Sequence, residues 1–230
     1  MQAWFKFKEI DSRDMGVTVT AMPSSVRADK RVNAITIPGR NGTLHFDDEV
    51  YDSYVNTMEC AIKNRTKIDE IAAWLVGSGD MIFSTEPTKV YKVFIANKIE
   101  IAQMMRKFQK FMLSMDTQPF KYSVNARSEN LELTAPTTIH NKGTVYSQPT
   151  ITVYGSGNIT LTINGTNYGL SGVDSYITID SEMMEVYKDS TNANNKYSAM
   201  DFPMFEVGQN SVGWTGSVTK IEIEPKWRFL

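Results

Sequence analysis

Two groups of carboxylates have the residue types that acid–base or metal chemistry requires. Asp47, Asp48 and Glu49 follow one another and could bind a cation, but neighbouring residues on a strand point to opposite faces. We therefore expect a solvated turn at these three positions. Glu222 and Glu224 share one strand face, and a glycosidase needs two facing carboxylates. Its acids usually come from different strands, whereas adjacent like charges on one strand indicate a face that points to solvent.

A nucleophilic thiol is the other candidate. Cys60 is the one cysteine, and His45 and His140 are the only two histidines that could act as its base. Cys60 stands in the run YVNTMECAIKN, which is typical of a small buried hydrophobic position. The chain has no nucleotide-binding fingerprint, no metal-spaced cluster of histidine and cysteine, and no Gly-x-Ser-x-Gly elbow. We expect no enzyme, no catalytic residue, no cofactor and no bound metal.

The segment AITIPGRNGTLHF raises a different possibility, because it places turn-forming residues between two alternating runs. Ile35 and Ile37 alternate before the turn, and Leu44 and Phe46 alternate after it. The turn itself consists of Pro38, Gly39, Arg40, Asn41 and Gly42. Two glycines and an asparagine favour backbone angles with positive φ. By itself, the segment predicts a hairpin turn.

Composition narrows the class of protein. The 230 residues are 41% hydrophobic, which is sufficient for a core, and no window approaches the length of a transmembrane helix. The start lacks the apolar stretch of a secretion signal, and one cysteine excludes an intrachain disulfide, so we expect synthesis in a reducing cytoplasm. A net charge of −2 without a run of basic residues makes nucleic-acid binding an improbable main role.

Most of the first half alternates as β-strands do, and one helix interrupts it at about residues 66–77. An apolar stripe at helical spacing is formed by Ile68, Ile71, Ala72 and Leu75. Thr66 and Asp69 resemble a capping box at its start, and Gly77 is a natural stop at its end. The strand KFQKFMLSMDTQPFKY follows, in which Phe111, Leu113 and Met115 share one face.

The second half has shorter strands and clearer turns. Gly155-Ser156-Gly157 is interpreted as a turn, and Asn164-Gly165 predicts a type I′ hairpin. Strands separated by regular turns favour a sandwich of two antiparallel sheets. A polar stretch at 125–145 reads as a linker or as an edge strand, and we place two domains at 1–134 and 137–230.

Sugar binding is an alternative function for this second half. β-Sandwiches often bind glycans by stacking aromatic rings on the sugar. Trp214 and Trp227 are the candidates for such stacking, although large aromatic residues more often belong to a core.

The order of these features resembles the distal tail protein (Dit) family of long-tailed phages that infect Gram-positive bacteria. In the first half, the resemblance rests on the proline-glycine-arginine turn, the single helix and the closing motif TQPFKY at 117–122. In the second half, it rests on NKGTVYSQPTITVYGSGNITLTING, ITIDSE, VGQNSVGWTG and the ending IEPKWRFL. The family often has an acidic residue between the arginine and the second glycine, where this chain has Asn41. Asn41 therefore offers a neutral amide where the resemblance implies a carboxylate.

This resemblance implies a structural role in the virion tail tip. It implies a mainly β fold, with a β-barrel-like or split-sheet first domain that carries one helix and a galectin-like second sandwich. It further implies a homo-hexameric ring that links the tail tube protein to the tail-associated lysin or hub protein, with receptor-binding or baseplate proteins as further neighbours. DNA would pass only through the lumen, and no membrane is involved. We expect the turn at 38–42 to present Arg40 to a subunit or tube contact.

Overall fold

The structure, a computed structural model, describes residues 2–62, 65–96, 101–105, 108–125 and 129–230. The side chains of residues 47–49, 65, 101–105, 108 and 109 are outside this description. The turn expected at 47–49 is wrong, because the backbone there belongs to the strand Leu44–Tyr51. Contacts divide the chain into two compact units, Met1–Val124 with Leu230, and Asn125–Phe229. Each unit has a hydrophobic core of its own.

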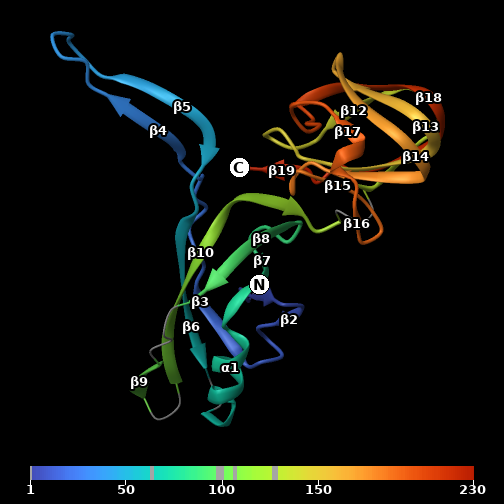
Figure 1. Cartoon of the computed structure of the whole chain (residues 1–230). Coiled ribbons are helices and arrows are strands. Elements are labelled where there is room, and N and C mark those ends of the chain that lie inside the picture. Colours follow the sequence, from blue (N-terminus) through green and yellow to red (C-terminus); the bar gives the residue numbers. More distant parts are fainter. Residues whose placement is uncertain (1, 63–64, 97–100, 106–107, 126–128) are drawn as a thin grey trace. The chain divides into compact units, whose positions relative to one another are not determined.

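The first unit is built on one antiparallel sheet with the strand order β2-β1-β7-β8-β10-β6-β3, and β9 pairs with β10 (Figure 1). Its strands are β1 Phe5–Phe7, β2 Ile10–Asp11, β3 Val17–Ala21, β6 Tyr54–Ile62, β7 Gly77–Phe83, β8 Lys89–Ile95, β9 Ile101–Met105 and β10 Phe108–Ser123. The sheet curls into a half-barrel around the core. As the alternation predicted, Phe111, Leu113 and Met115 are buried together.

The helix α1, Ile68–Trp74, packs against this core after a short 3₁₀ turn at Arg65–Lys67. Trp74 stacks on Phe5 with ring centroids 5.5 Å apart, and its Nε1 donates a hydrogen bond to the backbone oxygen of Phe7 at 3.0 Å. The tryptophan therefore joins the helix to β1 by both packing and hydrogen bonding.

The helix is shorter than the sequence indicated. Its N-cap is Lys67, which makes no side-chain cap bond, so the helix begins one residue later than the predicted cap at Thr66. The chain leaves the helix after Trp74, and Gly77, with φ of 76°, opens β7 rather than ending the helix. Pairing of Gly77 with Ile95 in β8 explains this early end, because the sheet takes up the backbone groups there.

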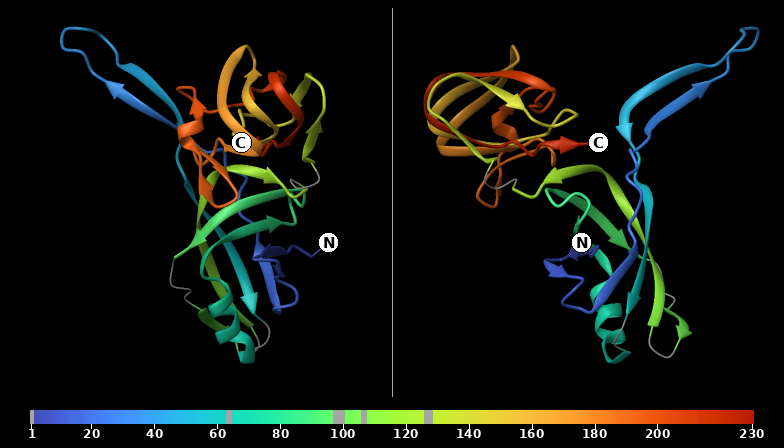
Figure 2. Two further views of the ribbon diagram at one scale, coloured as in Figure 1. Left: turned by 45° about the vertical axis from the view of Figure 1, so that its right-hand side comes forward. Right: turned by 180° about the vertical axis from the view of Figure 1, so that it is seen from behind.

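The strands β4, Lys30–Ile35, and β5, Leu44–Tyr51, form a separate two-stranded sheet, here called the arm. Figure 2 shows the arm as a ribbon that continues from β3 and β6 in both views.

The second unit is an antiparallel sheet that curls around one core. Its order is β11-β18-β13-β14-β15-β16, with β12 on β18 and β17 on β14. Its strands are β11 Leu131–Leu133, β12 Thr137–Asn141, β13 Thr150–Ile163, β14 Thr166–Asp180, β15 Glu185–Lys188, β16 Thr191–Asn192, β17 Tyr197–Ser198 and β18 Gly208–Glu224. A 3₁₀ turn spans Asn194–Lys196, and β19, Arg228–Phe229, ends the chain.

The two turn predictions in this unit differ in outcome. Asn164 and Gly165 connect β13 to β14 with φ of 50° and 84°, which confirms the hairpin. The expected turn at Gly155-Ser156-Gly157 is wrong, because β13 continues through it with irregular register. The glycines instead let β13 bulge and bend, so that residues on both sides of the bulge face the same core.

The division between the units falls after Val124, earlier than the boundary at 134–137 that the sequence indicated. The reason is pairing: Leu131–Leu133 and Thr137–Asn141 both lie against β18. The polar stretch at 125–145 thus contributes two short edge strands to the second unit.

The surroundings of Asp180, at the end of β14, make the stability of the second unit depend on pH. Burial alone would raise the pKa of this carboxyl. The backbone N–H of Met183, the ammonium group of Lys226 and the hydroxyl of Thr150 together hold the pKa below its ordinary value. A lowered pKa stabilises the fold above the unfolded-state value of about 3.9, and this stabilisation is lost as pH falls through the folded-state pKa.

We expect Asp180→Asn to destabilise the second unit by about 1.5–3 kcal/mol at pH 7, because hydrogen bonds to a charged group contribute about that much. Urea unfolding measured at pH 7 and again below pH 3 checks this expectation. The two proteins should converge at the lower pH, and a constant difference would contradict it.

Candidate functional site: an exposed β-arm

The turn at 38–42 forms the tip of the arm. The backbone N–H of Arg40 donates a hydrogen bond to the oxygen of Ile37 at 3.1 Å, and Ile35 pairs with Leu44. Gly39 and Gly42 adopt φ of 81° and 86°. The predicted hairpin turn with positive φ is therefore confirmed.

The stem of the arm is unusual because its apolar side chains are exposed. Ile35 is 49% exposed and Phe46 is 58% exposed, although the alternation around them resembles that of a half-buried strand. The same is true of Val32, Ile37, Leu44 and Val50. A two-stranded hairpin without a core is at best marginally stable in water, so such a surface marks an interaction site.

The root of the arm, in contrast, is well anchored. The backbone N–H of Asp52 donates to the oxygen of Asp29 at 3.0 Å, and the Asp52 carboxylate pairs with Arg31. The ring of Tyr51 meets Phe120 edge-on, with centroids 5.4 Å apart. These contacts fix where the arm leaves the first unit.

Arg40 is the charged group at the tip. Arg40 is exposed, and its guanidinium makes no hydrogen bond and no ion pair within the described residues. A planar guanidinium of this kind can bind a carboxylate through two parallel hydrogen bonds. Pro38, Gly39, Asn41 and Gly42 surround it and shape the turn that presents it.

The tryptophans considered for sugar stacking lie elsewhere. Trp227 is only 4% exposed and packs near Phe205, with ring centroids 5.9 Å apart. Trp214 is partly buried and packs against the same core. A sugar therefore has no access to the ring of Trp227, and the preference of large aromatic residues for a core explains both positions.

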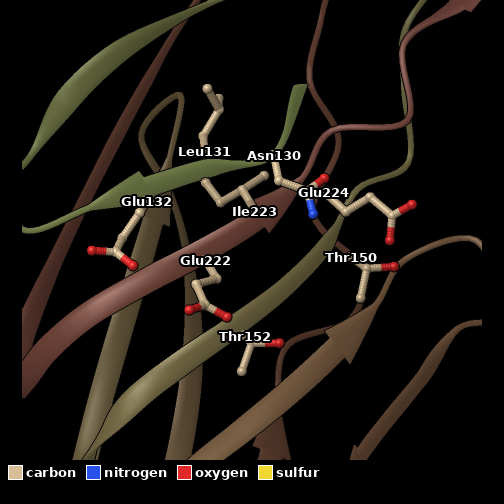
Figure 3. Close-up of a pocket in the computed structure, with 8 residues that line it drawn as sticks. All are labelled: Asn130, Leu131, Glu132, Thr150, Thr152, Glu222, Ile223 and Glu224. Carbon is tan, nitrogen blue, oxygen red and sulfur yellow. The ribbon is translucent and has the colours of Figure 1, made fainter. Parts of the chain in front are cut away.

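The paired carboxylates Glu222 and Glu224 line a groove of about 410 Å³ on the second unit (Figure 3). Glu222 accepts hydrogen bonds from Lys220 Nζ at 2.6 Å and from the Tyr154 hydroxyl at 2.9 Å. These bonds, that from Lys220 above all, lower the pKa of Glu222. A glycosidase acid needs a raised pKa, so Glu222 is unsuited to donate a proton.

A lysine covers one face of the Tyr154 ring beside this groove. Lys220 lies over this ring at 4.8 Å from the centroid, and the Tyr176 ring lies 5.6 Å away. This row of stacked side chains stabilises the outer face of the sheet through cation–π and aromatic contacts.

The remaining candidate for chemistry is Cys60, which is completely buried. Burial raises the pKa of its thiol to about 12, so the thiolate that nucleophilic catalysis requires does not form near neutral pH. Among the residues that the structure describes, no group of three or more metal-ligating side chains is present. The same part of the chain contains no helix long and apolar enough to span a membrane.

Sequence reasoning identified the tip of the arm but missed its exposed stem. The alternation of its apolar residues predicts one face of an ordinary sheet strand. No local signal distinguishes this stem from a core strand, because Ile221 and Ile223 are also flanked by charged residues and are buried.

Comparison with known proteins places these features in context. Residues 8–117 match the model of a family described as the phage tail protein RIFT-related domain. The crystal structure of the Dit protein of SPP1, described as a paradigm of the hub adsorption apparatus in phages that infect Gram-positive bacteria, matches with a TM-score of 0.76. That match covers 100% of both chains at 15% sequence identity, and it shows a shared fold. No curated protein sequence matches this chain.

Proposed function

We propose that this protein is a ring-forming adaptor of the virion tail tip. The premise is that residues 8–117 match the model of the phage tail protein RIFT-related domain and that the whole chain shares the fold of a Dit protein. The resemblance to distal tail proteins and the mainly β fold that the sequence predicted are both confirmed by these comparisons. The hexameric ring is a further part of this proposal, and the exposed arm supports it.

The exposed arm is the observation that carries this proposal. Burial of exposed apolar side chains such as Ile35, Leu44 and Phe46 against a partner would stabilise the complex. The free energy of association becomes more favourable by about 25 cal/mol for each Å² of apolar surface removed from water. The arm also has two unpaired outer strand edges, because β4 and β5 pair only with each other in the part of the chain that the structure describes. A head-to-tail contact of this kind generates a closed ring where its rotation closes.

In the proposed assembly, the first units form the ring and the second units decorate it. One face of the ring meets the tail tube protein, and the other meets the tail-associated lysin or hub protein. DNA passes through the lumen without being held. The protein is assembled in the host bacterial cytoplasm and resides in the virion tail tip, where receptor-binding or baseplate proteins are further neighbours.

A role as a glycan-binding module was the alternative, and the geometry does not favour it. The ring of Trp227 is buried, and Lys220 covers one face of the Tyr154 ring. Titration of the protein with purified host cell-wall polysaccharide keeps this alternative testable. Binding that Trp214→Ala abolishes in a folded protein would support it.

The mass of the protein in solution tests the ring. Six chains of 26.0 kDa would give about 156 kDa (6 × 26.0 kDa) by light scattering after size exclusion. We expect this species for the protein alone or after mixing with its tail tube protein. A monomer under both conditions would contradict the proposal.

Arg40→Ala is expected to weaken this assembly without unfolding the chain. Removal of one partner from a desolvated charge pair typically costs about 2–5 kcal/mol, so the association constant should fall by at least about tenfold. Sedimentation velocity measures the association, and circular dichroism checks the fold. Lys142→Ala removes an exposed cation from the second unit and is the control. Equal association of both variants would make the motif a plain hairpin turn.

A further inference from the structure

The two strands that lead into the arm separate before they reach it. β3 pairs with β6 only from Val17 with Ile62 to Ala21 with Glu59. Residues 22–29 then form no strand, and pairing resumes at Lys30 with Tyr51 in the arm. Along this edge, β6 has no strand partner over Tyr54–Met58 within the part of the chain that the structure describes.

This separation leaves a groove of about 390 Å³ between β6 and the segment at 21–26. Its walls carry three exposed apolar side chains, Val26 at 43%, Val55 at 68% and Met112 at 60%. An unpaired strand edge with apolar walls is the geometry in which an extended segment adds as a further strand.

One charged side chain, Glu59, lines the groove. It is exposed and makes no ion pair or side-chain hydrogen bond within the described residues. The unpartnered carboxylate of Glu59 is thus complementary to the unpartnered guanidinium of Arg40 at the tip of the arm. Bidentate pairing of these two groups would fix the register of an added strand.

The arm of the same chain does not supply this strand. β4 begins at Lys30, four residues after Val26, and Figure 2 shows the ribbon of the arm extending away from β3 and β6. The arm of another copy has the required features, namely unpaired strand edges, exposed apolar residues and Arg40. One copy would then donate its arm and accept that of a neighbour, which is a heterologous contact.

We propose that the groove formed by residues 21–26, β6 and Met112 receives the arm of a second copy of this chain, with Arg40 of the arm paired to Glu59. The proposal rests on the ring proposed above and specifies where one subunit meets the next. It assigns the donor and the acceptor to different parts of the first unit.

Charge reversal tests the pair. Glu59→Arg and Arg40→Glu should each lower the association constant at least about tenfold, because each places like charges together. The double variant should restore association to within about threefold of the natural chain. Glu70→Arg, on the exposed side of α1, is the matched control and should leave association unchanged. Association that survives both single reversals would overturn the pair.

Cross-linking tests the groove independently of charge. A chain with Val55→Cys and Ile37→Cys should form covalent dimers and larger ladders under mild oxidation. The natural chain should form none, because Cys60 is buried.

A hexamer without these cross-links would overturn the groove as acceptor while the ring stands. A monomer without cross-links, even with the tail tube protein, would overturn both proposals. Loss of tube binding in Glu59→Arg with an intact ring would assign the groove to another tail component and also overturn this inference.

Discussion

Replacing Gly155 with alanine is expected to destabilise the second unit by at least about 3 kcal/mol, because β13 and β18 approach too closely there for a side chain. An added Cβ would lie 2.1 Å from the backbone oxygen of Ser217 and 2.9 Å from Cδ1 of Ile159. The first of these contacts is with backbone, so relief requires the two paired strands to separate.

The matched control is Gly157→Ala, two residues along the same strand. An added Cβ there meets nothing within 4 Å, but Gly157 has φ of 78°, where alanine costs about 1–2 kcal/mol. The comparison separates a steric effect from a conformational one. Hydrogen exchange of the β13 and β14 amides in urea measures it, because Trp4 and Trp74 of the first unit would also contribute to tryptophan fluorescence. Equal losses for the two variants would show that the strands can part at little cost.

Trp74→Ala is expected to destabilise the first unit by about 3–5 kcal/mol. The substitution removes the stacking on Phe5, the tilted contact with Phe7, and the hydrogen bond from Nε1 to the Phe7 oxygen. It also leaves a cavity between α1 and β1, which the surrounding core can fill only in part.

Trp74→Phe serves as the control, because it keeps an aromatic ring and loses the N–H donor. We expect it to cost about 1–3 kcal/mol, less than the alanine variant. Hydrogen exchange measured by mass spectrometry resolves the two units and avoids the assumption of one unfolding transition for the whole chain. The amides of β1 and β7 should lose protection while those of β13 and β14 keep it. Loss of protection in both units would contradict the assignment of Trp74 to one core.

The sequence was most informative where local chemistry leaves little choice. Asn164-Gly165 predicted a two-residue hairpin, and the alternation of Phe111, Leu113 and Met115 predicted one buried face. The turn at Gly39 and Gly42 was likewise predictable, because few residues other than glycine adopt positive φ.

The failures share a cause, which is pairing between segments far apart in the chain. The triplet Gly155-Ser156-Gly157 has the composition of a turn, but the partner strand β18 runs alongside it and makes it a bulge. The polar residues at 125–145 left a linker and an edge strand as alternatives, and pairing with β18 decides for edge strands. Neither partner is visible from a local window.

The candidate site shows the same limit. The sequence alone determined the tip of the arm, its turn and the guanidinium of Arg40, because these depend on residues close together in the chain. Only the tertiary structure decided that Ile35 and Phe46 are exposed and that β6 has an open edge beside Glu59. A period of two residues states which side chains share a face, whereas long-range packing determines what covers that face.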